Sequence, residues 1–235
     1  MKKKRILLKL TGTIFASQTN DNAFSTEAIT PIIEQIKELQ KTHQFGIVIG
    51  GGNIFRGEQH GSKLGLSPSV GHQTGMLATI INGLLLKDLL DQQRIDTTLL
   101  SAIVCPQIAN PISQDNIDHA LKHGRIIIFA GGTGAPFFTN DTNAIVRGLQ
   151  MEASQVWKGT DVEGIYSADP QTDKQATLIK KMTYSDAISQ KLGIMDNTAI
   201  ALAEKHTLLI RVFNIFTPNA LIKAAEDKDF GSTIQ

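Results

Sequence analysis

Three glycine-rich stretches, two of them beside a cation, are the parts of this sequence best suited to chemistry. Each follows an apolar, β-branched run: Lys9-Leu10-Thr11-Gly12, residues 50–57 and residues 130–141. Glycines at such places let backbone N–H groups approach an anion closely, and a helix that follows adds partial positive charge at its N-terminus. Strand-to-helix turns also use glycine for its φ alone. Three such loops, with Lys9 and Arg56 beside two of them, predict a phosphate site.

The fingerprints of several other enzyme classes are missing from the sequence. No Gly-Lys pair occurs, which excludes a P-loop, and neither large glycine cluster fits Gly-x-Gly-x-x-Gly. The zinc-protease motif His-Glu-x-x-His and the hydrolase elbow Gly-x-Ser-x-Gly are also missing. The six histidines are scattered and the single Cys105 has no Cys-x-x-Cys partner, so we expect no metal-binding residues.

Phosphoryl transfer is the chemistry that fits what remains. It needs positive charge on the transferred group and in-line positioning more than it needs a protein nucleophile. Lys9 ends one predicted strand and Arg56 follows another, so both can reach a polyphosphate at the edge of a sheet. Asp141 and Asp196 stand at predicted helix starts beside the same edge, where each can either act on the substrate or cap its helix.

Apolar, β-branched runs alternate with segments of helical spacing along the chain. The runs, which we predict to be buried strands, are 5–10, 45–49, 97–102, 125–129, 154–158 and 209–213. Helical spacing recurs at 29–39 and 77–85, and the predicted helix starts include Thr30-Pro31 and Thr217-Pro218. The alternation predicts an α/β fold, an open and mainly parallel sheet with helices on both faces. Residues 159–183 are expected to form a hairpin or extended loop over one end of it.

Composition narrows the class of protein further. The chain has 41% hydrophobic and 19% charged residues over 235 positions, which is typical of a folded domain with a well-filled core. Its net charge of +1 lacks the basic excess of a nucleic-acid-binding protein, so we expect no nucleic-acid partner. Lys9 interrupts the apolar run after the basic N-terminus, and no window reaches the ~18 apolar residues of a membrane span. We expect a cytoplasmic protein with no membrane partner.

Together these motifs resemble the amino acid kinase family, and most closely its bacterial uridylate (UMP) kinase branch. The two most specific stretches are Gly-Gly-Gly-Asn-Ile-Phe-Arg-Gly at 50–57 and Gly-Thr-Gly-Ala-Pro-Phe-Phe-Thr at 132–139. This pair distinguishes the branch from the acetylglutamate, aspartate and carbamate kinases. Further matches lie at 5–12, 75–79, 164–170, 195–196 and 210–214, so that the resemblance runs nearly from end to end.

The resemblance implies a three-layer αβα sandwich that transfers the γ-phosphate of ATP to UMP. The products would be UDP and ADP, made in pyrimidine nucleotide biosynthesis. Mg²⁺ would be a cofactor and a homohexamer the usual assembly. Within a single amino acid kinase-like domain 1–235, the acceptor-binding part would comprise roughly residues 1–150 and the ATP-binding part roughly 151–235.

The resemblance also implies roles for individual residues. Lys9 would neutralise charge on the transferred phosphoryl group, and Asp141 would orient that lysine. The ATP-binding residues would be Lys9, Leu10, Thr11, Gly12, Gly52, Arg56, Thr160, Tyr166 and Asp169. The UMP-binding residues would be Gly51, His72, Thr133, Gly134, Ala135, Pro136, Phe137, Phe138, Thr139 and Asn140.

The chain departs from the family pattern at several positions. His72 stands where the family usually has an aspartate that accepts hydrogen bonds from the uridine ribose, and Ala135 and Asn140 replace Asn and Thr. Asp161 reverses the charge of a lysine position near the ATP site. The loop at 15–24 does not match a segment that forms part of a GTP activator site in some relatives, which predicts a weak response to GTP.

Two alternatives stay open at this point. A different phosphate acceptor, a carboxylate or a carbamate, would suit an acceptor pocket altered at His72 and Ala135. A weakly catalytic nucleotide-sensing module would suit the reversed charge at Asp161, although Lys9 and Asp141 are retained.

Overall fold

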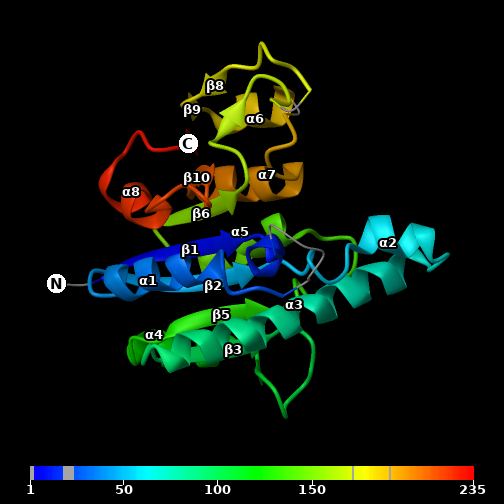
Figure 1. The fold of residues 1–235 in the computed structure, drawn as a ribbon, viewed down its shortest axis with the longest axis vertical. Coiled ribbons are helices and arrows are strands. Elements are labelled where there is room, and N and C mark those ends of the chain that lie inside the picture. The colour runs from blue at the N-terminus through cyan, green and yellow to red at the C-terminus, as the bar shows by residue number, and fades with distance from the viewer. Residues whose placement is uncertain (1–2, 18–23, 171, 191) are drawn as a thin grey trace.

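A nine-stranded sheet forms the centre of the computed structural model, which describes residues 3–17, 24–170, 172–190 and 192–235 (Figure 1). The strand order is β4-β3-β5-β2-β1-β6-β10-β11-β9. Within this sheet, as far as the structure describes it, only β10 and β11 pair antiparallel. The strands are β1 (Lys4–Leu10), β2 (His43–Ile49), β3 (Thr97–Ser101), β4 (Asn110–Pro111), β5 (Ile126–Ala130), β6 (Gln155–Thr160), β9 (Lys181–Met182), β10 (Leu209–Asn214) and β11 (Ser232–Ile234). The predicted mainly parallel α/β fold is confirmed, and the six predicted strands are present.

Helices cover both faces of the sheet and complete three layers. On one face pack α1 (Ile29–Leu39), α3 (Pro68–Gln92) and α8 (Ala220–Glu226); on the other pack α4 (Gln114–Lys122), α5 (Asn140–Gln150) and α7 (Asn197–Lys205). Strand β1 serves both layers because successive side chains alternate across a sheet. Ile6 and Leu8 belong to the first layer and Leu7 to the second, and all three are fully buried.

Two small elements extend the sandwich beyond the sheet. Strands β7 (Ile165–Tyr166) and β8 (Leu178–Ile179) pair antiparallel, so of the hairpin or extended loop expected within 159–183 the structure forms the hairpin. This hairpin lies with α6 (Tyr184–Gln190) at the top of Figure 1. Helix α2 (Gly57–Lys63) and the beginning of α3 project from the sheet at the right of the same view.

The predicted helix starts were only partly correct. Asp196 caps α7, since its carboxylate accepts a hydrogen bond from the N–H of Ala199. Thr30 lies inside α1 instead, and its hydroxyl donates to the carbonyl of Thr26. Helix α8 begins two residues after Pro218, behind Asn219 in the left-handed conformation. A Thr-Pro pair is compatible with a helix start but does not fix its position, because neighbouring residues can supply the turn.

The three glycine loops meet at one edge of the sheet. They follow β1, β2 and β5, which are neighbours in the order β5-β2-β1, and parallel strands end at the same edge. The N–H of Gly50 donates to the carbonyl of Leu10 over 2.9 Å, which joins the first two loops directly. Of the loop linked to the expected GTP response, residues 18–23 lie outside the described part. Among the described residues, no helix is both long and apolar enough to cross a membrane.

Candidate active site

Asp141 lies between two lysine ammonium groups at the edge of the sheet where the three glycine loops meet. Its Oδ1 is 3.1 Å from Nζ of Lys9, and its Oδ2 accepts a hydrogen bond of 2.8 Å from Nζ of Lys158. Strands β1 and β6 are parallel neighbours, and their register pairs Lys9 with Lys158. The sheet therefore sets the two cations side by side, while α5 supplies the carboxylate from its first turn. The predicted association of Asp141 with Lys9 is present.

Asp141 does not cap its helix, which was the alternative role considered for it. Thr139 caps α5 by accepting hydrogen bonds from the N–H groups of Asp141 and Thr142. Because the threonine hydroxyl satisfies these donors, the carboxylate of Asp141 is left to the lysines. Its position in the first turn also lets the helix dipole favour its negative charge.

Burial and charge act in opposite directions on this cluster. Burial disfavours the ionised carboxyl of Asp141, but the ammonium groups of Lys9 and Lys158 outweigh it and hold the pKa of Asp141 below its ordinary value. Burial lowers the pKa of Lys158, and the charge of Asp141 offsets only part of this effect. With two cations against one anion in a partly desolvated place, the cluster favours an additional negative charge.

Lys158 is a site residue that the sequence analysis missed, having placed it only at the end of a strand. Its ammonium group also donates to the carbonyl of Ile194, a residue of the segment before α7. A signal was present, because a lysine in an otherwise apolar strand is costly to bury without a partner. Strand pairing was still needed to set it beside Lys9.

Asp196 braces the start of α5 against the start of α7. Its oxygens accept hydrogen bonds from the hydroxyls of Thr139 at 2.5 Å and Thr142 at 2.8 Å, besides capping α7. Its charge also makes a minor upward contribution to the pKa of Lys158, which burial lowers. The main contacts of Asp196 are therefore structural, since they hold together the beginnings of α5 and α7 next to the cluster.

A hollow of about 400 Å³ lies on one side of the cluster. The predicted UMP-binding residues that line it are Gly51, His72, Phe138, Thr139 and Asn140. Gly52 and Arg56, which were predicted to bind ATP, line this hollow as well. Gly132 lines it too, and no hydrogen bond among the described residues occupies the N–H groups of Gly51, Gly52 and Gly132. Free glycine N–H groups beside an arginine are suited to an anion. We refer to this space as the acceptor hollow.

The described side chains that line the acceptor hollow include a positive charge, that of Arg56, and no negative charge. Arg56 and His72 line it, and its described lining side chains include no carboxylate. The ring of His72 packs against that of Phe137, with 5.0 Å between centroids. Phe137 is 67% exposed and has φ of 72°, an uncommon conformation for a bulky residue. This strained aromatic therefore contacts His72, a lining residue of the hollow, without lining the hollow itself.

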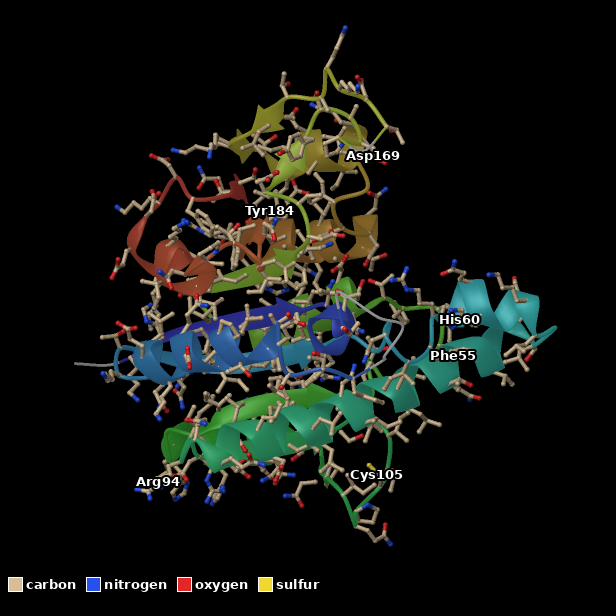
Figure 2. All side chains as sticks on the ribbon, in the orientation of Figure 1. Phe55, His60, Arg94, Cys105, Asp169 and Tyr184 are labelled. Atoms are coloured by element: carbon tan, nitrogen blue, oxygen red, sulfur yellow. The ribbon has the colours of Figure 1, made fainter. Side chains whose placement is uncertain are left out.

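A second hollow of about 410 Å³ lies beside the β7–β8 hairpin. Its lining includes one member of the cluster and the three predicted residues of the adenine and ribose end: Lys158, Thr160, Tyr166 and Asp169. The hydroxyl of Tyr166 donates to Glu163, and this hydrogen bond raises the pKa of Tyr166. Figure 2 shows Asp169 at the hairpin and Phe55 near α2, so the two hollows open at separate places along the edge.

Several predicted residues are not directed at either hollow. The side chain of Leu10 is fully buried in the core, so only its backbone can serve a nucleotide. Thr11 caps the short 3₁₀ helix η1 (Gly12–Phe15). Gly12 packs against the second loop so closely that a Cβ there would lie 2.5 Å from Oδ1 of Asn53.

In the third glycine loop, the side chain of Thr133 forms hydrogen bonds with the loop's own backbone. The hydroxyl of Thr133 donates to the carbonyl of Ala135 and accepts from its N–H. The lining of the acceptor hollow takes in the two ends of this loop and leaves out its middle, Thr133, Gly134, Ala135, Pro136 and Phe137. A role for these five residues in acceptor binding stays a prediction.

Comparisons with known proteins agree with this architecture. The profile of the amino acid kinase family matches residues 4–214, and the chain belongs to that family. It is 42% identical over 222 residues to a uridylate kinase of Mycoplasma pneumoniae, covering 94% of each chain. It is 40% identical over 232 residues to the uridylate kinase of Yersinia pestis, covering 98% of this chain and 95% of the relative. A crystal structure of UMP kinase from Ureaplasma parvum superposes with a TM-score of 0.94 at 34% identity, over 100% of both chains.

Proposed function

We propose that this protein is a UMP kinase, a phosphotransferase that moves the γ-phosphate of ATP to UMP and forms UDP and ADP. The Lys9–Asp141–Lys158 cluster, flanked by the two hollows, is the observation that carries the proposal. Full-length similarity to uridylate kinases supports UMP as acceptor and ATP as donor. The same similarity favours UMP over a carboxylate or carbamate acceptor.

The proposed reaction needs no nucleophile from the protein. A phosphate oxygen of UMP in the acceptor hollow attacks the γ-phosphorus of ATP held in the second hollow. A new P–O bond forms, the bond between the γ-phosphorus and the bridging oxygen breaks, and ADP leaves with that electron pair. Lys9 and Lys158 neutralise the charge that spreads over the transferred group, and Asp141 holds both ammonium groups in place. The free N–H groups of the glycine loops orient the phosphates.

Mg²⁺ belongs to the proposal only as part of the donor. Among the described residues, no group of three or more His, Cys, Asp or Glu side chains is arranged to hold a metal ion. The oxygens of Asp141 face two ammonium groups, and those of Asp196 accept hydrogen bonds from Thr139, Thr142 and Ala199. These carboxylates do not fit a metal cage. Mg²⁺ would therefore bind to the phosphates and water, as it commonly does in kinases.

Assembly, location and division of labour extend the proposal. Helix α3 exposes Leu77, Ile81, Leu84 and Leu85, spaced along one side, at 37–51% exposure each. An apolar stripe of this kind on a water-facing helix favours contact with another copy, which supports the proposed homohexamer. We further propose that the acceptor-binding part comprises roughly residues 1–150 and the ATP-binding part roughly 151–235, with the loop at Lys9 also serving ATP. The protein would supply UDP for pyrimidine nucleotide biosynthesis in the cytoplasm.

An acceptor panel tests the proposed activity. Purified protein with Mg-ATP is offered UMP, CMP, dUMP, acetylglutamate, aspartate and carbamate, and ADP release is followed by a coupled assay. We expect turnover with UMP at least 100-fold above turnover with the carboxylates and carbamate. Preference for a carboxylate or carbamate would replace UMP with the alternative acceptor class. Nucleotide binding without turnover on any acceptor would instead indicate a sensing module.

A further inference from the structure

Helix α3 holds two of the three glycine loops through two buried side chains one turn apart. These side chains are Thr79 and Asn82, which are 3% and 0% exposed. Thr79 ended the matching stretch 75–79 but was given no role, and Asn82 was not singled out, because an asparagine within an apolar helix forms no motif. Both direct hydrogen-bonding atoms at the loops beyond β2 and β5.

Asn82 fastens the loop after β2 at two points. Its Nδ2 donates to the carbonyl of Gly50 at 2.7 Å and to Oδ1 of Asn53 at 2.7 Å, and Nδ2 of Asn53 donates back to Oδ1 of Asn82 at 3.3 Å. The intervening Gly51 is pressed onto α3, where a Cβ would lie 2.7 Å from that of Ala78. The turn after β2 is therefore held in one position on α3, by the hydrogen-bonded amides of Asn82 and Asn53 and by the close contact of Gly51 with the helix.

Thr79 fastens the loop after β5 in a comparable way. Its Oγ1 accepts a hydrogen bond of 2.8 Å from the N–H of Gly131 and donates one of 2.7 Å to the carbonyl of Met76. The helix carbonyl thereby orients the hydroxyl so that its lone pair faces the loop. Gly131 has φ of 75°, so the loop turns sharply at the point of attachment, immediately before Gly132.

We propose that Thr79 and Asn82 are positioning residues for phosphoryl transfer, which together fix the spacing between the two phosphate-binding loops. Gly51, Gly52 and Gly132 all line one hollow, and no hydrogen bond among the described residues occupies their N–H groups, yet they belong to loops that follow different strands. A rigid helix that holds both loops by side chains three residues apart sets their separation. The inference rests on the proposed kinase activity, in which a misplacement of about 1 Å can lower the rate ~100-fold.

Four variants test the two residues by kinetics. Thr79→Val and Asn82→Ala remove the bonds to the loops, Asn82→Asp keeps the shape but loses the donors, and Thr79→Ser keeps the hydroxyl. We expect kcat to fall at least tenfold in the first three and to stay within threefold of the parent in Thr79→Ser. Leu90→Ala is the matched control, because Leu90 is fully buried on the same helix and remote from both loops in sequence. It should lower stability while leaving kcat within twofold of the parent at temperatures where it is folded.

Hydrogen exchange of the loop gives a readout that does not depend on activity. The N–H groups of Ile54 and Phe55 donate to the carbonyl of Gly51 at 3.0 and 2.9 Å, so their protection reports whether the turn is held. Asn82→Ala should speed their exchange at least tenfold, and Leu90→Ala should not. If the parent protein fails to phosphorylate UMP, the proposed function fails, while the exchange result still decides whether Asn82 holds the loop.

Three results would overturn the positioning role. The role is overturned if folded Thr79→Val and Asn82→Ala enzymes keep the kcat of the parent, whatever rates of hydrogen exchange they show. An equal loss of kcat in Leu90→Ala would show that general destabilisation of α3 explains the effect. A loss of kcat in Thr79→Ser as large as that in Thr79→Val would show that the hydroxyl of Thr79 is not what positions the loop.

Discussion

Lys9 and Lys158 are register partners on adjacent parallel strands, and both reach the same carboxylate, that of Asp141. Two like charges on neighbouring strands repel, so their pairing is stable only with an anion between them. Asp141 supplies that anion. In the proposed reaction the transferred phosphoryl group would add a second anion, so the geometry that pairs the two strands also suits a polyanion.

Lys9 should be needed for chemistry more than for folding. Its side chain lies at the end of β1, and Asp141 keeps Lys158 as an ion-pair partner when Lys9 is truncated, so the fold should be retained. Removing one such charge from a preorganised site commonly lowers kcat ~10²–10³-fold. Steady-state kinetics of Lys9→Ala with UMP and ATP, on protein shown to be folded by circular dichroism, checks this. A rate within a few-fold of the parent would mean that Lys9 has been assigned wrongly.

Lys158→Met should also lower kcat at least tenfold, because methionine keeps the length of the side chain and removes its charge. Lys158 lines the second hollow, so the KM for ATP is expected to rise more than the KM for UMP. Lys181→Met is the control, since Lys181 is exposed on the edge strand β9. Equal kinetics of the two variants would remove Lys158 from the site.

Asp141→Asn should destabilise the protein at neutral pH by ~3–5 kcal/mol, the usual cost of leaving buried charges unpaired. The lysines hold the pKa of Asp141 below its ordinary value of 3.8, so its stabilising contribution is complete above that value and is lost as pH falls through the lower folded-state pKa. Urea unfolding of parent and variant at neutral pH and near pH 2 measures the difference. A difference that stays the same at both pH values would contradict the ion-pair account.

His72→Asp should tighten UMP binding. A carboxylate accepts hydrogen bonds from both ribose hydroxyls, whereas an imidazole offers at most one acceptor. The affinity of the variant should also vary less between mildly acidic and neutral pH, because a carboxylate stays ionised there. Calorimetric titration of UMP into both proteins across that range is the measurement. Unchanged or weaker binding would indicate that His72, packed on Phe137, does not meet the ribose.

Ile81→Glu should break the proposed assembly into smaller species. Ile81 is 47% exposed within the apolar stripe of α3, and a carboxylate buried in an interface without a partner is strongly unfavourable. Light scattering coupled to size exclusion reports the mass of parent and variant. Lys87→Glu, a charged position further along the same helix, serves as a comparison. A parent that is already monomeric would contradict the proposed hexamer itself.

The sequence alone determined the class of fold and the edge of the sheet at which the candidate site lies. Alternating apolar runs and helical segments require a parallel sheet between helices, and glycine loops that follow strands must gather at its carboxyl edge. These patterns are local in sequence, so they can be recognised without knowing the order in which the strands pair. Lys9 and Asp141 were found in this way, since each stands at the end or start of a legible element.

Tertiary structure decided which of these residues meet. Lys158 was invisible as a partner of Lys9 because their pairing spans 149 positions and depends on strand order, which no local pattern encodes. The hydrogen bonds of Thr79 and Asn82 could not be predicted for the same reason, since their partners lie on loops of other strands. Hydrogen bonds and ion pairs act only over a few ångströms in space, and distance along the chain does not predict distance across the fold.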